Sequence, residues 1–116
     1  MIMVSQRIPV RLTSDEYALL DGLKDSYRLS TRTDAMKKAI RVAMAYQFED
    51  PEAILGLEFR TRSTRPFVFR VNALELKSLN LLWRRFAVEH SYKLRCALHL
   101  SAMRKGIVYD KSTQPV

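Results

Sequence analysis

Cysteine is almost absent from this chain, and glycine and proline are scarce. The sequence contains one cysteine, three glycines and four prolines in 116 residues. The lone Cys96 excludes an internal disulfide framework and fits a reducing cytosol. So little glycine and proline argues against a disordered or loop-rich chain. The sequence therefore predicts one compact unit, or two very small ones, built from regular helices and strands.

Long apolar runs are also missing. No stretch approaches the roughly 18 consecutive apolar residues that a membrane-spanning helix needs. The first ten residues, MIMVSQRIPV, lack the charged segment followed by an apolar segment that marks a secretory signal. We therefore expect a cytoplasmic protein without a membrane partner, associated with the nucleoid if it binds DNA.

Negative charge is in short supply. The chain carries 20 Lys and Arg against 12 Asp and Glu, which gives a net charge of +8. The excess is uneven, because residues 1–50 hold 8 basic and 7 acidic side chains whereas residues 51–116 hold 12 and 5. This balance favours nucleic acid or another anionic surface as the partner.

Motifs that would indicate an enzyme or a metal site are not found. The sequence has no nucleophile motif, no glycine-rich phosphate loop and no HExxH. His90, Cys96 and His99 lack the paired spacing and the fourth ligand of a zinc site. We therefore expect no catalytic residue, no metal, no cofactor and no small-molecule substrate.

What the sequence does contain, near its start, is an alternating run that leads directly into a helix signal, RIPVRLTSDEY, residues 7–17. Ile8, Val10 and Leu12 occupy alternate positions and predict a strand with one apolar face. Thr13 and Glu16 then supply the T-x-x-E pattern of a capping box, which starts a helix. The apolar residues of that helix recur at helical spacing: Tyr17, Leu20, Leu23 and Tyr27.

A second helix is predicted after the run RLSTRTD. Thr31 and Asp34 predict a second capping box, and we expect the helix to end near Tyr46. Its apolar positions again follow a helical period: Ala35, Met36, Ala39, Ile40, Ala43 and Met44. The predicted order is therefore strand, helix, helix.

The same order returns 59 residues later in RPFVFRVNALEL. Asn72 and Glu75 stand where Thr13 and Glu16 stood, so a third capping box is predicted. The apolar residues expected on the following helix are Leu76, Leu79, Leu82 and Phe86, and Trp83 is expected in the core beside them.

A last helix is predicted in HSYKLRCALHLSAMRKG. Ser91 is its candidate N-cap, and Gly106 is a candidate helix end. The chain then divides into residues 1–46, the first repeat; residues 47–64, a linker with a short helix after Pro51; residues 65–106, the second repeat; and residues 107–116, a tail.

One strand-helix-helix unit cannot fold alone, since its strand lacks a partner and its helices bury too little surface. Two units solve both problems if their strands pair antiparallel over four helices. The fold class expected is mainly α with a short two-stranded antiparallel ribbon, in a pseudo-dimer of the two repeats. Pro9 and Pro66 fit this pairing, because their parity lets both nitrogens point away from the ladder. The alternative is that Pro9 ends a shorter strand.

The succession of strand, capping box, amphipathic helix and LSTRTDAMKKAI resembles the ribbon-helix-helix regulators of the Arc and MetJ type. The run TRTD, residues 31–34, is similar to the Ser-Arg-Ser-Glu-like start of their second helix. Two copies in one chain resemble the tandem members, such as TraY of conjugative plasmids and a regulator of archaeal filamentous viruses. The resemblance covers roughly residues 6–46 and 65–106.

This resemblance implies that the ribbon reads base edges in the major groove of duplex DNA, into which a two-stranded ribbon fits. Arg11 and Arg70 are the candidates for bidentate contacts to guanine, and Pro9 and Val68 for contact with a thymine methyl. The full set of outward side chains is Arg7, Pro9, Arg11, Pro66, Val68 and Arg70.

The resemblance also implies phosphate contacts where the second helix of a repeat begins. In the first repeat these residues are Thr31, Arg32 and Thr33, whose backbone N–H groups and helix dipole suit an anion. In the second repeat the run HSYKLR has no acidic third position, and Lys93, with Arg95 beside it, is the expected substitute.

The function expected is sequence-specific binding of double-stranded DNA by a transcriptional regulator that represses by occupying an operator, with self-association on DNA. The run RTRSTR, residues 60–65, is either a solvated linker or a further phosphate contact. Three other functions stay open: an accessory protein at a transfer origin, an antitoxin-like protein-interaction module, and non-specific DNA packaging. The tail of about ten residues counts against the antitoxin, and the near-neutral first half counts against packaging.

Overall fold

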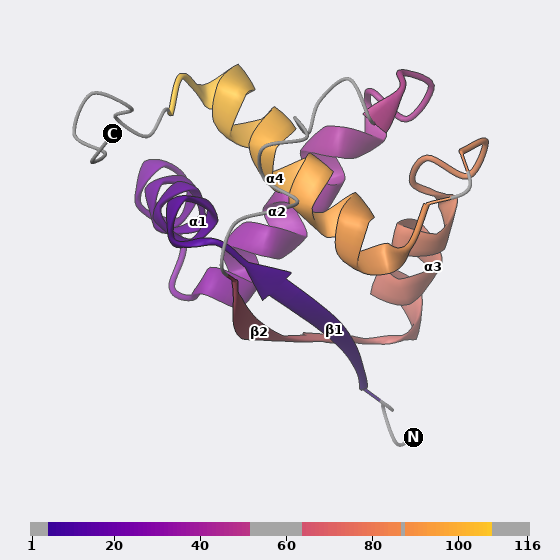
Figure 1. Ribbon diagram of the computed structural model, residues 1–116, viewed down its shortest axis with the longest axis horizontal. Coiled ribbons are helices and arrows are strands. Elements are labelled where there is room, and N and C mark those ends of the chain that lie inside the picture. Colours follow the sequence, from indigo (N-terminus) through magenta and orange to yellow (C-terminus); the bar gives the residue numbers. More distant parts are fainter. Residues whose placement is uncertain (1–4, 52–63, 87, 108–116) are drawn as a thin grey trace.

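The structure, a computed structural model, describes residues 5–51, 64–86 and 88–107. The order strand, helix, helix occurs twice along the chain, and the helices lie to one side of the paired strands (Figure 1). The elements are β1 (Gln6–Leu12), α1 (Ser14–Ser26), α2 (Arg32–Met44), β2 (Arg65–Val71), α3 (Ala73–Leu81) and α4 (His90–Lys105). The chain is therefore mainly α with one short ribbon, as the sequence predicts.

The two strands pair antiparallel over their whole length, from Gln6 opposite Val71 to Leu12 opposite Arg65. Pro9 lies inside β1 and opposite Val68, so the alternative of a shorter first strand is wrong. Both strands alternate buried and exposed residues, because successive side chains point to opposite faces. The buried row is Ile8, Val10, Leu12, Phe67, Phe69 and Val71.

The helix starts confirm two of the three predicted capping boxes. The Thr13 hydroxyl accepts from the Glu16 N–H at 3.2 Å, and a Glu16 carboxylate oxygen accepts from the Thr13 N–H at 2.9 Å. Asn72 and Glu75 make the same reciprocal pair, both at 2.8 Å. These bonds satisfy N–H groups that a helix start leaves without an intrahelical partner.

A single hydrophobic core lies between the ribbon and the helices, and both repeats supply it. α4 contributes most, since it packs against β1, α1 and α2 and buries every residue from Lys93 to Ala102 except Arg95. α3 makes fewer contacts and buries only Leu79 along its length. Figure 1 shows α4 crossing α2, with α1 on one side and α3 on the other. The two repeats are therefore packed unequally.

Two helix ends differ from the prediction. α3 ends at Leu81 rather than continuing to Phe86, because Leu82 is extended and Trp83 has a positive φ of 50°. This turn buries the Trp83 indole completely, and its Nε1–H donates to the Tyr46 carbonyl at 3.2 Å. α2 ends at Met44, two residues before the predicted end.

The boundaries of α4 give one correction and one confirmation. Its N-cap is Glu89, which makes no capping hydrogen bond through its side chain, so the prediction of Ser91 as the cap is wrong. Its end at Gly106, with φ of 78° in the left-handed region, is confirmed. The short helix expected after Pro51, most of RTRSTR and the tail from residue 108 lie outside the described residues.

Candidate nucleic-acid interface

The outward face of the ribbon carries every residue that was predicted to read bases. These side chains form three cross-strand pairs, and all six are exposed. The pairs are Arg7 with Arg70, Pro9 with Val68, and Arg11 with Pro66. Neither strand contains an acidic residue, so the face presents three guanidinium groups and three apolar side chains.

Arg7 and Arg70 lie directly opposite each other at one end of this face. Like charges at directly opposed positions of a ribbon destabilise it, by about 0.2–1 kcal/mol. Neither guanidinium has a hydrogen bond or an ion pair with the residues that the structure describes. Val68, next along the face, is 54% exposed although it is apolar. The opposed arginine pair costs folding free energy, and an anionic partner would relieve its repulsion.

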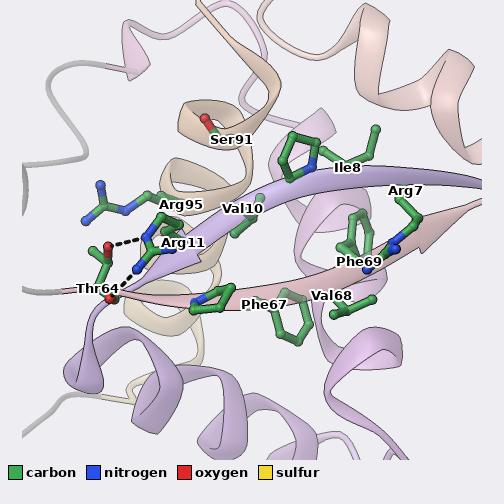
Figure 2. Close-up of a pocket in the computed structure, with 12 residues that line it drawn as sticks. Arg7, Ile8, Val10, Arg11, Thr64, Phe67, Val68, Phe69, Ser91 and Arg95 are labelled. Carbon is green, nitrogen blue, oxygen red and sulfur yellow. Dashed lines mark hydrogen bonds between the residues drawn. The ribbon is translucent and has the colours of Figure 1, made fainter.

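Arg11 differs from these two because it is already hydrogen-bonded. Its Nε donates to the Thr64 hydroxyl at 3.0 Å and its Nη2 donates to the Thr64 carbonyl at 2.9 Å. Figure 2 shows the guanidinium turned toward Thr64, at the residue before β2. The side chain is therefore held at the end of the ribbon rather than left free over its centre.

A depression of about 760 Å³ lies along the ribbon beside α4. It is lined by residues of both strands and by Ser91 and Arg95 from the first turns of α4 (Figure 2). The predicted reading residues Arg7, Pro9 and Arg11 all line it. The edge of the ribbon that faces α4 is therefore concave.

The start of α2 shows only the Thr31 half of the predicted capping box, and Arg32 has internal partners. The Thr31 hydroxyl accepts from the Asp34 N–H at 3.1 Å. Arg32 donates from Nε and Nη2 to the two carboxylate oxygens of Asp21 at 2.7 and 2.9 Å, and these bonds lower the pKa of Asp21. The whole group remains at the surface, with the Arg32 side chain 47% exposed. Thr31 is exposed and Thr33 is half-buried beside it.

Tyr17 connects this helix start to the ribbon. Its hydroxyl donates to the Pro66 carbonyl at 2.6 Å, and its ring stacks edge-on against Phe67. Two guanidinium groups lie over the same ring, Arg32 at 5.0 Å and Arg65 at 5.1 Å from the centroid. Cations over an aromatic face are held by its quadrupole. Arg65, the last residue of RTRSTR, thus lies beside Arg32, a pairing that sequence patterns alone do not indicate.

Lys93 does not lie where a phosphate contact requires it. It is only 5% exposed, and its ammonium donates to the carbonyls of Leu79 and Asn80 at 3.1 and 3.4 Å. Burial also lowers the pKa of this lysine. The prediction that Lys93 binds phosphate is therefore corrected: the residue satisfies the last carbonyls of α3. Arg95, its suggested neighbour in that role, is bonded to Glu16.

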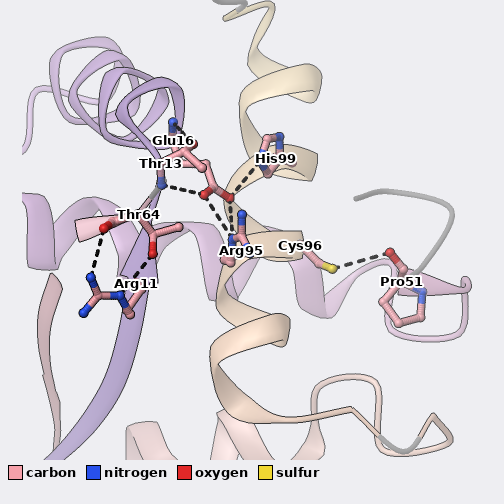
Figure 3. Close-up of polar contacts among 8 residues, drawn as sticks. All are labelled: Arg11, Thr13, Glu16, Pro51, Thr64, Arg95, Cys96 and His99. Atoms are coloured by element: carbon pink, nitrogen blue, oxygen red, sulfur yellow. Dashed lines mark hydrogen bonds and ion pairs between the residues drawn. The ribbon is translucent and has the colours of Figure 1, made fainter. Parts of the chain in front are cut away.

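Glu16 connects α1 to α4, a structural role that its place in the predicted capping box did not indicate. Its carboxylate is fully buried and accepts from Arg95 Nε at 2.8 and 3.0 Å and contacts His99 Nε2 at 3.0 Å (Figure 3). Burial opposes ionisation, but the bonds to His99, Arg95 and Thr13 outweigh it and lower the pKa of Glu16 to about 2. The predicted capping residue is therefore also the counter-ion of α4.

Comparison of the chain with protein-family models, with curated proteins and with solved structures found no match. Within the described ranges, no helix is long and apolar enough to cross a membrane. The same residues contain no group of three or more His, Cys, Asp or Glu side chains that would hold a metal ion.

Proposed function

We propose that this protein binds double-stranded DNA sequence-specifically and regulates transcription, with the ribbon in the major groove. The observation that carries the proposal is the outward face of β1 and β2. It presents three arginines and no carboxylate, and Arg7 faces Arg70 with no counter-charge among the described residues. A two-stranded ribbon fits the major groove, where arginine is the commonest specific partner of guanine.

In this proposal the chain is a tandem ribbon-helix-helix unit that acts as its own dimer. The order strand, helix, helix occurs twice, both strands are seven residues long, and both first helices begin with a capping box. These features support the likeness to ribbon-helix-helix regulators, in which two such units share one ribbon. The intramolecular pairing of β1 with β2 predicts a monomer in solution that already has a complete ribbon.

In this proposal the ribbon contacts the DNA bases and the start of α2 contacts the DNA backbone. Arg7 and Arg70 supply donors for base edges, and Val68 and Pro9 supply apolar surface for a thymine methyl. The start of α2, with Arg32 and nearby Arg65, faces outward beside the end of the ribbon and would contact phosphate. Occupation of an operator by this surface would repress transcription, and the same surface would serve an accessory protein at a transfer origin.

The test is selection of bound sequences from a random duplex pool at about 150 mM salt, followed by affinity measurements on the enriched sequence. Arg70→Ala should weaken binding to it by about 1–3 kcal/mol while leaving the fold intact. Lys105→Ala is the matched control, because it also removes one exposed positive charge but lies at the end of α4 far from the ribbon (Figure 1).

Four results would contradict parts of the proposal. Absence of binding would remove DNA as the partner. Binding without an enriched sequence, with a steep salt dependence, would indicate a packaging protein instead. Equal losses for Arg70→Ala and Lys105→Ala would mean that general charge, and not the ribbon, makes the contact. Light scattering that shows an obligate dimer would refute the single-chain ribbon.

A further inference from the structure

The ribbon is chemically unequal from end to end. Val68 is the counterpart of Pro9 at the 59-residue spacing of the repeats, and the two lie opposite each other in the middle of the ribbon. A half-turn about this pair would exchange the ends, placing Arg7 on Pro66 and Arg70 on Arg11. In a symmetric dimer those residues would be identical. Here Pro66 stands at the position that matches Arg7. One end of the ribbon therefore presents two arginines, and the other presents one arginine and one proline.

The end formed by Arg7 and Arg70 is suited to base edges. Both side chains are exposed, and neither has a hydrogen-bonding or ionic partner in the part of the chain that the structure describes. Their donors are therefore available in full for bidentate contact to guanine O6 and N7. No aromatic ring or carboxylate of the described residues restrains either guanidinium.

The other end is suited to the DNA backbone. Arg11 is bonded to Thr64 through two of its nitrogens, and Pro66 has no donor at all. Beside them lie the two guanidinium groups over the Tyr17 ring, which is itself fixed to the Pro66 carbonyl. Groups held in this way are preorganised point charges, which suits a phosphate whose position does not depend on sequence.

The cluster around Tyr17 has a net positive charge. Asp21 balances Arg32, with which it forms a bidentate pair. Arg65 has no carboxylate partner among the described residues, and its contact with the ring leaves its N–H groups for a phosphate. The cluster occurs on one side only, because the 59-residue counterpart of Tyr17 is Leu76, which offers neither a hydroxyl nor a ring.

We infer that this protein reads a non-palindromic DNA site in a fixed direction, an inference that rests on the proposed function. Arg7 and Arg70 read guanines at one end of the site. Pro9 and Val68 favour thymine at its centre. Arg32 and Arg65 grip the backbone at the other end through Tyr17, with little base preference. The specificity determinants are thus concentrated at one end of the ribbon and the phosphate grip at the other.

The same selection from a random duplex pool tests the inference. The expected motif is asymmetric, with G·C pairs enriched at one end and little preference at the other. Arg7→Ala and Arg70→Ala should each lower affinity for the motif roughly 5- to 150-fold and relax the preference in the same half. A palindromic motif, or loss of preference in opposite halves, would overturn the inference while the proposed function stands. Failure to enrich any motif would count against the proposed function itself.

Arg65→Ala separates the two ends. This variant should weaken binding to all sequences by the same factor. The slope of log K against log salt should become shallower by about 1, the change expected when one phosphate contact is lost. Arg70→Ala is its matched comparison, since it removes the same side chain from the other end of β2. A change in base preference with Arg65→Ala would overturn the phosphate assignment.

A gain-of-symmetry variant completes the test. Pro66→Arg would place a guanidinium opposite Arg11, and the Tyr17 hydroxyl would keep its acceptor because that acceptor is the backbone carbonyl. The selected motif should then gain G·C preference at the second end and approach a palindrome. Circular dichroism and Trp83 fluorescence would verify the fold of each variant. An unchanged motif from a folded Pro66→Arg protein would contradict the inference.

Discussion

The Glu16 carboxylate accepts a hydrogen bond from Arg95 Nε at 2.8 Å, although 79 residues separate the two in the sequence. The same carboxylate also contacts His99, one helical turn further along α4. The first turn of α1 is thereby joined to the last helix of the second repeat. All three side chains are buried or nearly so, and this contact joins the two repeats beside the core that they share.

Glu16→Gln is expected to destabilise the protein by about 3–5 kcal/mol. The amide keeps the size of the side chain but removes the buried negative charge that accepts from Arg95 Nε. Urea unfolding at neutral pH, followed through the emission of Trp83, would measure the change. The fully buried indole of this single tryptophan makes it a suitable probe.

Glu75→Gln is the matched control, since Glu75 holds the same capping position in the second repeat. Its carboxylate is 27% exposed and pairs with the half-exposed Lys37 at 2.9 Å. An exposed ion pair contributes about 0.2–1 kcal/mol, so the loss should be correspondingly small. Equal losses in the two variants would show that Glu16 acts only as a cap.

Stability should fall in acid because of Glu16. Its pKa is lowered from 4.5 to about 2 in the folded protein. The stabilisation that this group contributes is therefore fully present above its unfolded pKa and is lost as the pH falls from about 4.5 toward about 2. A shift of this size corresponds to about 3 kcal/mol. Unfolding free energies measured from about pH 6 to about pH 2 would follow this loss, and the Glu16→Gln variant should show a flatter profile.

Lys93→Met should reduce stability by about 1–3 kcal/mol, because the buried carbonyl of Leu79 and the partly buried carbonyl of Asn80 lose their donor. Binding of the folded variant to DNA, and the salt dependence of that binding, should stay unchanged. Lys77→Met, at an exposed position on α3, is the control and should stay within about 0.5 kcal/mol of the parent. A reduced salt slope for Lys93→Met would restore the phosphate role that the structure argues against.

Alanine substitutions at neighbouring positions on β2 should change stability by very different amounts. Phe69→Ala removes a fully buried ring and should cost about 3–5 kcal/mol of folding free energy. Val68→Ala lies on the exposed face and should change stability by less than about 0.5 kcal/mol. Denaturant unfolding of the two variants gives this comparison directly. A larger loss for Val68→Ala would mean that the two faces of the ribbon are assigned the wrong way round.

Local patterns in the sequence were sufficient for the ribbon and most helix starts. The alternation around Ile8 and Phe67 specifies strand faces, because side chains in a strand have a period of two. Thr13 with Glu16, and Asn72 with Glu75, act within four residues, so their spacing alone predicts the caps. The outward position of the arginines follows from the same alternation.

Features that depend on distant partners were not predictable in the same way. Trp83 ends α3 early because its indole reaches the Tyr46 carbonyl 37 residues away, whereas the apolar spacing alone favours a continued helix. Nothing in the local sequence distinguishes Lys93 from a surface lysine, because its burial depends on the packing of α3 against α4. Whether Arg11 is free or bonded depends on Thr64, 53 residues further along the chain. Such contacts require the tertiary fold, and they decide which basic residues remain available.

The pairing of β1 with β2 inside one chain also sets how the ribbon responds to dilution. A ribbon shared by two separate subunits falls apart at low concentration, and its formation depends on the square of the subunit concentration. A ribbon within one chain forms by a first-order step, so the fraction of complete ribbons is the same at every concentration. If DNA is the partner, occupancy of a single site would then rise hyperbolically with the amount of protein, without the threshold that dimerisation imposes. The few molecules present soon after synthesis begins would already be competent to bind.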